Sequence, residues 1–261
     1  MKKNHFYIPY FGNKRQEVEK IYNSIKDDID KYNTIIEPFC GSSAFSYYIW
    51  LNNKDRDLTY ILNDNSKILI DLYNISKDEE KFKILYNSLI KLQEQTTNKE
   101  KYLEIVKNAN NDLLSYIYIN KVYSIRPGLY PTDKKFTIDS WKTFINAPII
   151  DFVRNAKITF LNKDAIDVYN EYKGNEKALI FLDPPYLISN NSWYKDPKIN
   201  VYEYLFENDI IKEKALIILC LENNWIIKLL FKDKKSITYD KIYQTTKKNT
   251  EHIIILNKKQ I

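Results

Sequence analysis

A stiff loop that carries an acid and an aromatic ring follows a strand-like run in the second half of the chain. The run KALIF at residues 177–181 is apolar and β-branched in character, which is typical of a buried strand. Two consecutive prolines, Pro184 and Pro185, then end the strand, because proline donates no hydrogen bond to a sheet. Asp183 stands at the first corner of the loop and Tyr186 at its exit. The loop either only ends the strand or presents polar groups and a ring to a ligand.

Three more acids follow strand-like runs elsewhere in the chain. Glu37 lies in IIEPFCGSS, Asp64 in ILNDN and Asp164 in FLNKD. The ligands of an open α/β sheet bind outside the carboxyl ends of its strands. A single aspartate at such a position is commonly a helix cap, but four acids at one edge of a sheet suit a ligand with several donors. Ribose hydroxyls, an exocyclic amine and an ammonium group are donors of that kind.

The turn EPFCGSS at residues 37–43 argues against a phosphate-bearing cofactor. It has a single glycine, no Lys-Ser/Thr pair of a P-loop, and an acid where a pyrophosphate would be repelled. NAD and ATP are therefore disfavoured. A nucleoside that carries a cation and no phosphate fits better, and S-adenosylmethionine is such a molecule.

The elements expected around these loops form an α/β fold. Successive strand–loop–helix units indicate a parallel sheet with helices on its faces. Residues 14–31 have the spacing of an amphipathic helix. The last two strand-like runs, KSITYDKIYQ and EHIIILN, are joined by polar residues and predict a closing hairpin. We expect a catalytic domain from residues 1–75 and 148–261, interrupted by a mostly helical insertion at residues 76–147.

The composition sets broad limits on the function. The chain has 261 residues, a net charge of +6 and a pI near 8.9, which leans weakly toward an anionic partner such as nucleic acid. Two cysteines give no disulfide framework, and His5 and His252 stand apart, so no metal site is expected. The longest apolar run, ALIILCL, is far shorter than the roughly 20 residues of a membrane span. We expect a soluble, intracellular protein with no membrane partner.

Taken in order, the motifs resemble those of the Dam-type, D12 class DNA adenine-N6 methyltransferases. The resemblance rests on YFGNKRQEVEKI, EPFCGSSAF, LNDN, FLNKDA and FLDPPYL, and it reaches the terminal EHIIILN. It implies a Rossmann-like sheet of an S-adenosylmethionine-dependent methyltransferase, a helical target-recognition insertion and a C-terminal β-hairpin. The implied reaction transfers a methyl group to the N6 amine of adenine in DNA.

The resemblance also implies which residues bind the cofactor. Tyr10 and Lys14 would close over its methionine part; the alternative for Lys14 is that it merely begins an amphipathic helix. Gly41 would let the backbone approach closely, while Asp64 would accept from the ribose and Asp164 from the adenine amine. The full implied set is Tyr10, Lys14, Glu37, Phe39, Gly41, Asp64, Asp164 and Asp183.

The implied catalytic residues are those of the proline-rich loop. Asp183 and the carbonyl of Pro184 would accept hydrogen bonds from the N6 amine and draw its lone pair toward the methyl donor. Pro185 would stiffen the loop, so that this geometry is set before binding. Tyr186 would stack on the base after it is flipped out of the duplex.

The DNA-binding residues and the substrate class leave alternatives open. Arg126, Lys134 and Lys135 would contact phosphates or a base edge, although the run around the two lysines is equally consistent with a solvated loop. Ser43 occupies a position at which the family commonly has glycine. An RNA adenine or cytosine-N4 methyltransferase is an alternative, with Asp183 favouring adenine. A relative that binds nucleic acid without turnover is another.

Overall fold

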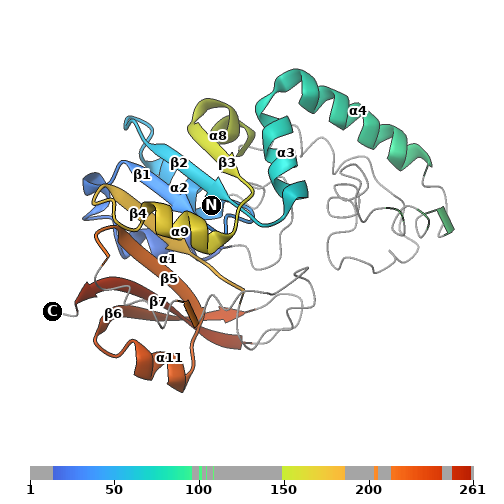
Figure 1. Cartoon of the computed structure of the whole chain (residues 1–261). Helices are drawn as coiled ribbons and strands as arrows, with labels where there is room; N and C mark the ends of the chain where they lie inside the picture. The colour runs from blue at the N-terminus through green and yellow to red at the C-terminus, as the bar shows by residue number, and fades with distance from the viewer. Residues whose placement is uncertain are drawn as a thin grey trace.

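The protein is built around one seven-stranded mixed sheet with helices on both faces (Figure 1). The computed structural model describes residues 14–95, 100–101, 104, 108, 149–185, 203–204, 213–242 and 249–259. The strand order is β3-β2-β1-β4-β5-β7-β6. The strands are β1 (Thr34–Glu37), β2 (Thr59–Asn63), β3 (Lys157–Leu161), β4 (Ala178–Leu182), β5 (Leu216–Glu222), β6 (Lys234–Ile242) and β7 (Asn249–Lys259).

The pairing of the strands confirms the expected methyltransferase-like, Rossmann-like fold. Strands β1 to β5 pair in parallel, whereas β7 runs antiparallel to both β5 and β6. The expected closing hairpin is therefore correct, and β7 enters the sheet between the other two strands. All five residues of β4 are buried, as is usual for a central parallel strand covered by helices on both faces.

The helices within the described residues are mostly short. They are α1 (Val18–Asn23), α2 (Ala44–Asn52), α3 (Lys67–Lys77), α4 (Glu79–Gln95), α8 (Ile149–Asn155), α9 (Ala165–Tyr172), α11 (Trp225–Leu230) and the 3₁₀ turn η1 (Ile29–Lys31). The helix expected at residues 14–31 breaks into α1, a run of turns and η1. Ser24 ends α1 because its hydroxyl bonds the carbonyl of Ile21, 2.6 Å away, in place of continuing the backbone ladder. The apolar positions of this segment are nevertheless buried as the pattern predicted.

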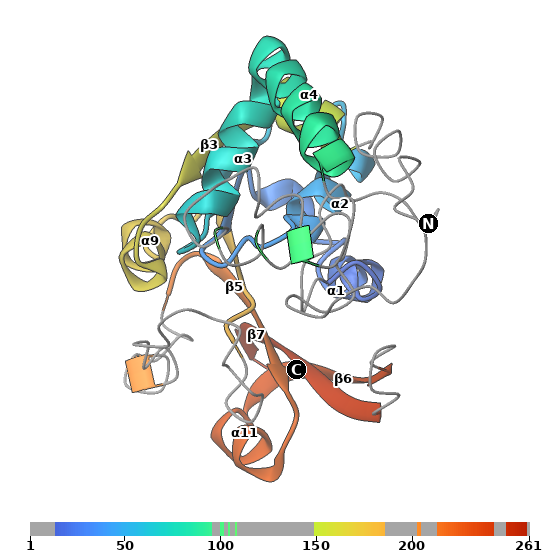
Figure 2. The same cartoon turned by 90° about the vertical axis from the view of Figure 1, so that its right-hand side faces the viewer.

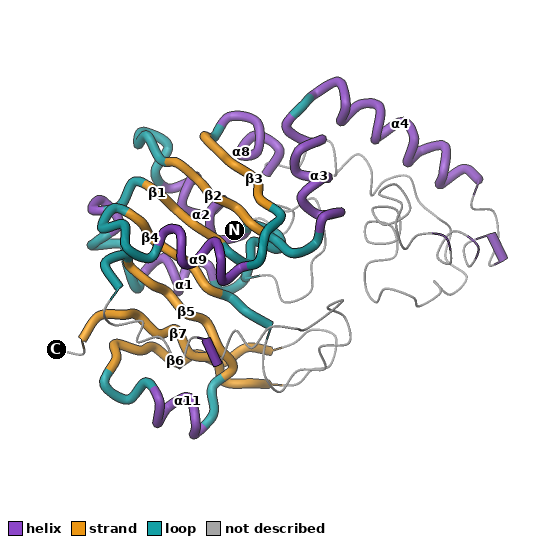
Figure 3. Tube along the Cα trace, in the orientation of Figure 1, coloured by secondary structure: helices purple, strands orange, loops and turns teal. Residues whose placement is uncertain are grey.

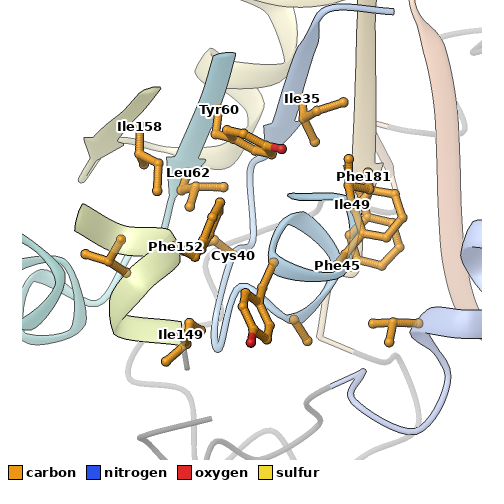
Figure 4. Close-up of a cluster of buried hydrophobic side chains, with 14 of the residues drawn as sticks. Ile35, Cys40, Phe45, Ile49, Tyr60, Leu62, Ile149, Phe152, Ile158 and Phe181 are labelled. Atoms are coloured by element: carbon orange, nitrogen blue, oxygen red, sulfur yellow. The ribbon is translucent and has the colours of Figure 1, made fainter. Parts of the chain in front are cut away.

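The two faces of the sheet carry separate hydrophobic clusters. Helices α1 and α9 lie on opposite sides of the strands (Figure 2), and their buried residues belong to different clusters. The cluster on the α1 side contains Phe45 and Phe181, whose rings stack at 4.3 Å, and Phe152, whose ring meets Tyr60 edge-on (Figure 4). Phe181 lies two residues before Asp183, so this packing fixes the strand from which the proline-rich loop leaves.

The expected insertion at residues 76–147 lies largely outside the described residues. Its first part is α4, which leads away from the sheet (Figure 1). Phe82, Leu85 and Leu89 of α4 are buried in the same cluster as α3. The division of the chain into two domains stays a prediction. Among the helices that the structure describes, none is long and apolar enough to cross a membrane.

Candidate active site

Four acidic side chains follow four adjacent parallel strands. Along the order β3-β2-β1-β4, the acids are Asp164 after β3, Asp64 directly after β2, Glu37 at the end of β1, and Asp183 directly after β4. The loop after β1 leads to α2, the loop after β2 to α3 and the loop after β3 to α9, as the tube in Figure 3 shows. The expectation that the four acids share one edge of the sheet is confirmed.

Glu37 caps a helix from a distance. Its Oε1 accepts a hydrogen bond of 2.8 Å from the backbone amide of Ser46, in the first turn of α2. This carboxyl replaces the cap expected of Ser43, whose side chain makes no cap bond to the helix. Burial raises the pKa of Glu37 to about 8, even though the bond from Ser46 opposes the shift. Glu37 is therefore a mainly protonated acid at neutral pH.

The turn between β1 and α2 has a strained backbone. Gly41 has φ 46° and Ser43 has φ 52°, both in the left-handed region. Ser43 thus keeps the conformation that explains why glycine is common at its position in the resembling family. The hydroxyl of Ser43 donates to that of Tyr73 at 3.2 Å, and the Tyr73 hydroxyl donates to the carbonyl of Gly41 at 2.7 Å. These bonds from α3 compensate for the strain and fix the turn.

Asp64 ties this turn to the loop after β2. Its Oδ2 accepts from the amide of Gly41 at 3.0 Å and its Oδ1 from the amide of Ser66 at 2.9 Å. Burial raises the pKa of Asp64, whereas the two backbone bonds favour its charged form. A carboxylate has about four acceptor positions, so two bonds leave it capacity for a ligand. Asp164 differs, because it is exposed and caps α9 through a 2.7 Å bond from Ile166.

Asn63 joins the loops on either side of it and escaped the sequence analysis. Its side-chain amide donates to the carbonyls of Pro38, at 2.9 Å, and Lys163, at 3.1 Å. Its side-chain oxygen accepts from the amide of Lys163 at 2.8 Å, and its own carbonyl accepts from Cys40 at 2.7 Å. Asparagine is disfavoured in strands, so its position at the end of the apolar run YIL was a usable signal.

Lys14 and Asp183 form a buried ion pair. The Nζ of Lys14 donates to Oδ1 of Asp183, and the two side chains are 3% and 17% exposed. Burial raises the pKa of Asp183, while the charge and hydrogen bond of Lys14 oppose that rise. The pKa of Lys14 is raised by Asp183 despite the opposing effect of burial. The Lys14 side chain thus reaches the loop that follows β4, and its expected contact with the methionine part of the cofactor stays a prediction.

The remaining predicted site residues divide into two groups. Pro184 is buried, Pro185 is half-buried, and Phe39 packs against the cluster on the α9 side. The predicted residues outside the described part of the chain are Tyr10, Arg126, Lys134, Lys135 and Tyr186. Within the described part, no group of three or more metal-ligating side chains comes together.

Comparison with known families agrees with this geometry. Residues 10–254 match the family described as D12 class N6 adenine-specific DNA methyltransferase. The match includes all four acids, Lys14 and the closing hairpin as far as Ile254. No curated protein matches the chain.

Proposed function

The chain belongs to the D12 class N6 adenine-specific DNA methyltransferase family, and on that basis we propose that the Lys14–Asp183 pair lies at its methyl-transfer site. The protein is a site-specific DNA methyltransferase that transfers a methyl group from S-adenosyl-L-methionine to the N6 amine of adenine. The observation that carries our assignment is the buried pair at the end of β4, beside the edge that carries the other three acids. The individual roles below are part of the proposal.

The hydrogen-bond acceptors at the sheet edge fit S-adenosylmethionine. Asp64 retains acceptor capacity for ribose hydroxyls, and Asp164 is exposed beyond the neighbouring strand to accept from an adenine amine. Gly41 brings the backbone close to that edge without a side chain. Glu37 and Phe39 flank the methionine end, together with Tyr10. When bound, the cofactor supplies an electrophilic methyl group on a sulfonium.

The catalytic loop prepares the adenine amine as a nucleophile. We assign to Asp183 and the Pro184 carbonyl the acceptance of the two N6 hydrogens, which draws the lone pair out of the ring. Burial raises the pKa of Asp183, and the charge and hydrogen bond of Lys14 oppose that rise and so favour its ionised form. As the bond from N6 to the methyl carbon forms, the bond from that carbon to sulfur breaks. A proton must then leave N6, and we assign Asp183 as the base that accepts it.

The finer features of the DNA partner also belong to the proposal. We assign the target as an adenine within double-stranded DNA that is flipped into the loop and stacked on Tyr186. Arg126, Lys134 and Lys135 contact the duplex, and the insertion at residues 76–147 reads the target site. The protein accordingly acts where the DNA that it modifies is found.

The test is methyl transfer from tritiated S-adenosylmethionine to unmethylated DNA or RNA, with products digested to nucleosides. The proposed site predicts label in N6-methyldeoxyadenosine, and loss of that label in Asp183→Ala with DNA binding retained. Lys67→Ala is a matched control, because it removes one member of an exposed ion pair on α3. Unchanged transfer by Asp183→Ala would refute the assigned site. Label in a ribonucleoside or in N4-methylcytosine would refute the DNA adenine substrate.

A further inference from the structure

A second buried ion pair lies next to the Lys14–Asp183 pair. The Nζ of Lys241, on β6, is 2.5 Å from Oε1 of Glu17, and the side chains are 9% and 5% exposed. Removing charges from water costs several kcal/mol per ion, so a pair this deeply buried is seldom maintained for stability alone. The family resemblance assigns no role to Glu17 or to Lys241.

The backbone couples this second pair directly to Lys14. The amide of Glu17 donates to the carbonyl of Lys14 at 2.9 Å, and the amide of Val18 donates to the same carbonyl at 2.8 Å. Lys14 and Glu17 are thus the two ends of a single hydrogen-bonded turn that leads into α1. A force on the Glu17 side chain moves the turn that aims Lys14 at Asp183.

The same four charges lie among the side chains of the closing strands. Asp183 feels the positive charge of Lys241, which lowers its pKa, and the negative charge of Glu17, which raises it. Cys220 of β5 interacts electrostatically with all four. His252 of β7 is neutral, since burial first and then Lys241 and Lys14 lower its pKa to about 3.

Further ionisable groups that face this cluster are Tyr239 and Glu37. Tyr239 of β6 interacts with Lys14, and Glu37 of β1 interacts with both Lys14 and Asp183. Glu37 is mainly protonated at neutral pH, and His252 carries no charge there. The cluster then contains two positive and two negative side chains, so any single substitution that removes a charge leaves it unbalanced.

We propose that Glu17 and Lys241 are positioning residues for methyl transfer, acting as a pair that orients Lys14 toward Asp183 and balances the charge around that carboxylate. The proposal rests on the catalytic role assigned to Asp183. It makes the C-terminal hairpin part of the catalytic machinery, because β6 supplies Lys241. Neither residue needs to touch the substrate or the cofactor.

The pair predicts pH effects of opposite sign. Glu17→Gln removes a negative neighbour and favours the Asp183 carboxylate, so the acid limb of the kcat/KM profile moves to lower pH. Lys241→Gln removes a positive neighbour and moves that limb to higher pH. Each shift should be about half a pH unit or more, with kcat/KM at the optimum about tenfold lower through the displaced Lys14. The double variant should return the limb to its original pH.

Lys258→Gln is the matched control. It breaks the ion pair between Lys258 and Asp28, which also joins the hairpin to the segment after α1. In the hairpin register, Lys259 pairs with Lys234, whereas Lys241 pairs with Thr250, so this control lies at the other end of β7. It should leave the acid limb in place. A loss of packing alone would affect the control and the two test variants alike.

The outcomes separate this inference from the proposed function. If neither single variant moves the acid limb, or if both move it in the same direction, the inference is overturned. If a single variant does not fold, Lys241→Arg is measured in its place. A lower kcat with the acid limb of the kcat/KM profile unmoved supports the inference, and an unchanged kcat overturns it. Activity retained in Asp183→Ala would instead refute the proposed site. If Asp183→Ala is inactive but the pH profiles of Glu17→Gln and Lys241→Gln are unshifted, the proposed site stands and only the role of the Glu17–Lys241 pair is refuted.

Discussion

Replacing Asn63 by alanine tests whether one buried amide holds the cofactor edge together. The change removes three side-chain hydrogen bonds, to the carbonyls of Pro38 and Lys163 and from the amide of Lys163. At about 1 kcal/mol for each bond, the free energy of unfolding should fall by about 3 kcal/mol, and by more where a freed group stays buried. For a chain of this size that corresponds to a Tm lower by about 6–12 °C.

The substitution should also weaken cofactor binding. Asn63 fixes the loop that carries Phe39 and Gly41 relative to the loop that carries Asp164. With that link removed, the Kd for S-adenosylmethionine should rise about tenfold, while kcat at saturating cofactor changes much less. Urea unfolding and isothermal titration calorimetry measure the two effects. Both measurements are made at a temperature well below the lowered Tm, so that unfolding is not mistaken for a loss of cofactor affinity.

Two further variants make the reasoning on Asn63 refutable. Asn162→Ala removes one bond, the 2.8 Å donation to the carbonyl of Asp64, and should cost only about 1 kcal/mol. Asn63→Asp keeps the acceptor for Lys163 but sets a carboxylate against two carbonyls, so its deficit should grow as the new acid ionises with rising pH. An Asn63→Ala protein within 1 kcal/mol of wild type, or no more affected than Asn162→Ala, would refute the argument.

The other expected outcomes concern three residues of the same edge. Glu37 has a pKa of about 8 in the folded chain against an ordinary value of 4.5. Between these two pH values the folded chain therefore binds more protons than the unfolded chain. In urea unfolding, the free energy of unfolding of the wild type relative to that of Glu37→Gln should therefore fall as pH rises from 5 to 8. A difference that does not change with pH would contradict this expectation. Ser43→Gly should be about 1 kcal/mol more stable than Ser43→Ala. Both variants lose the hydrogen bond to Tyr73, but only alanine keeps the strain of φ 52°. Equal stability of the two variants would count against that strain. Asp64→Asn should raise KM for the cofactor about tenfold with little change in kcat, and a loss confined to kcat would exclude ribose binding.

The sheet and its polar edge were predictable from local patterns. Each of the parallel strands β1 to β5 is a short, mainly apolar run, and the four acids stand where four of those runs end. Parallel strands place their carboxyl ends together, so the joint position of Glu37, Asp64, Asp164 and Asp183 follows from topology alone. The motifs of the resemblance fall on the same loops, which is why recognition and geometry agree.

The side-chain contacts inside the site were not predictable in that way. Lys14 and Asp183 are 169 positions apart, and nothing in the local sequence of either residue indicates the other. The helix expected at residues 14–31 was too long because the Ser24 hydroxyl donates to the backbone carbonyl of Ile21, a local competition that hydrophobic periodicity does not register. The Asn63 amide contacts carbonyls 25 and 100 positions away, which no local sequence pattern indicates.

The closing hairpin explains why such distant charges meet. Because β7 inserts antiparallel between β5 and β6, Lys241 pairs in register with Thr250 and Tyr239 with His252, two residues along. His252 in turn pairs with Glu222 at the end of β5, next to the strand that leads to Asp183. If β6 ran parallel to β7, its direction would be reversed and Lys241 would lie at the opposite end of the sheet. The antiparallel end of this sheet therefore brings a cation within 2.5 Å of Glu17, the residue one turn beyond Lys14.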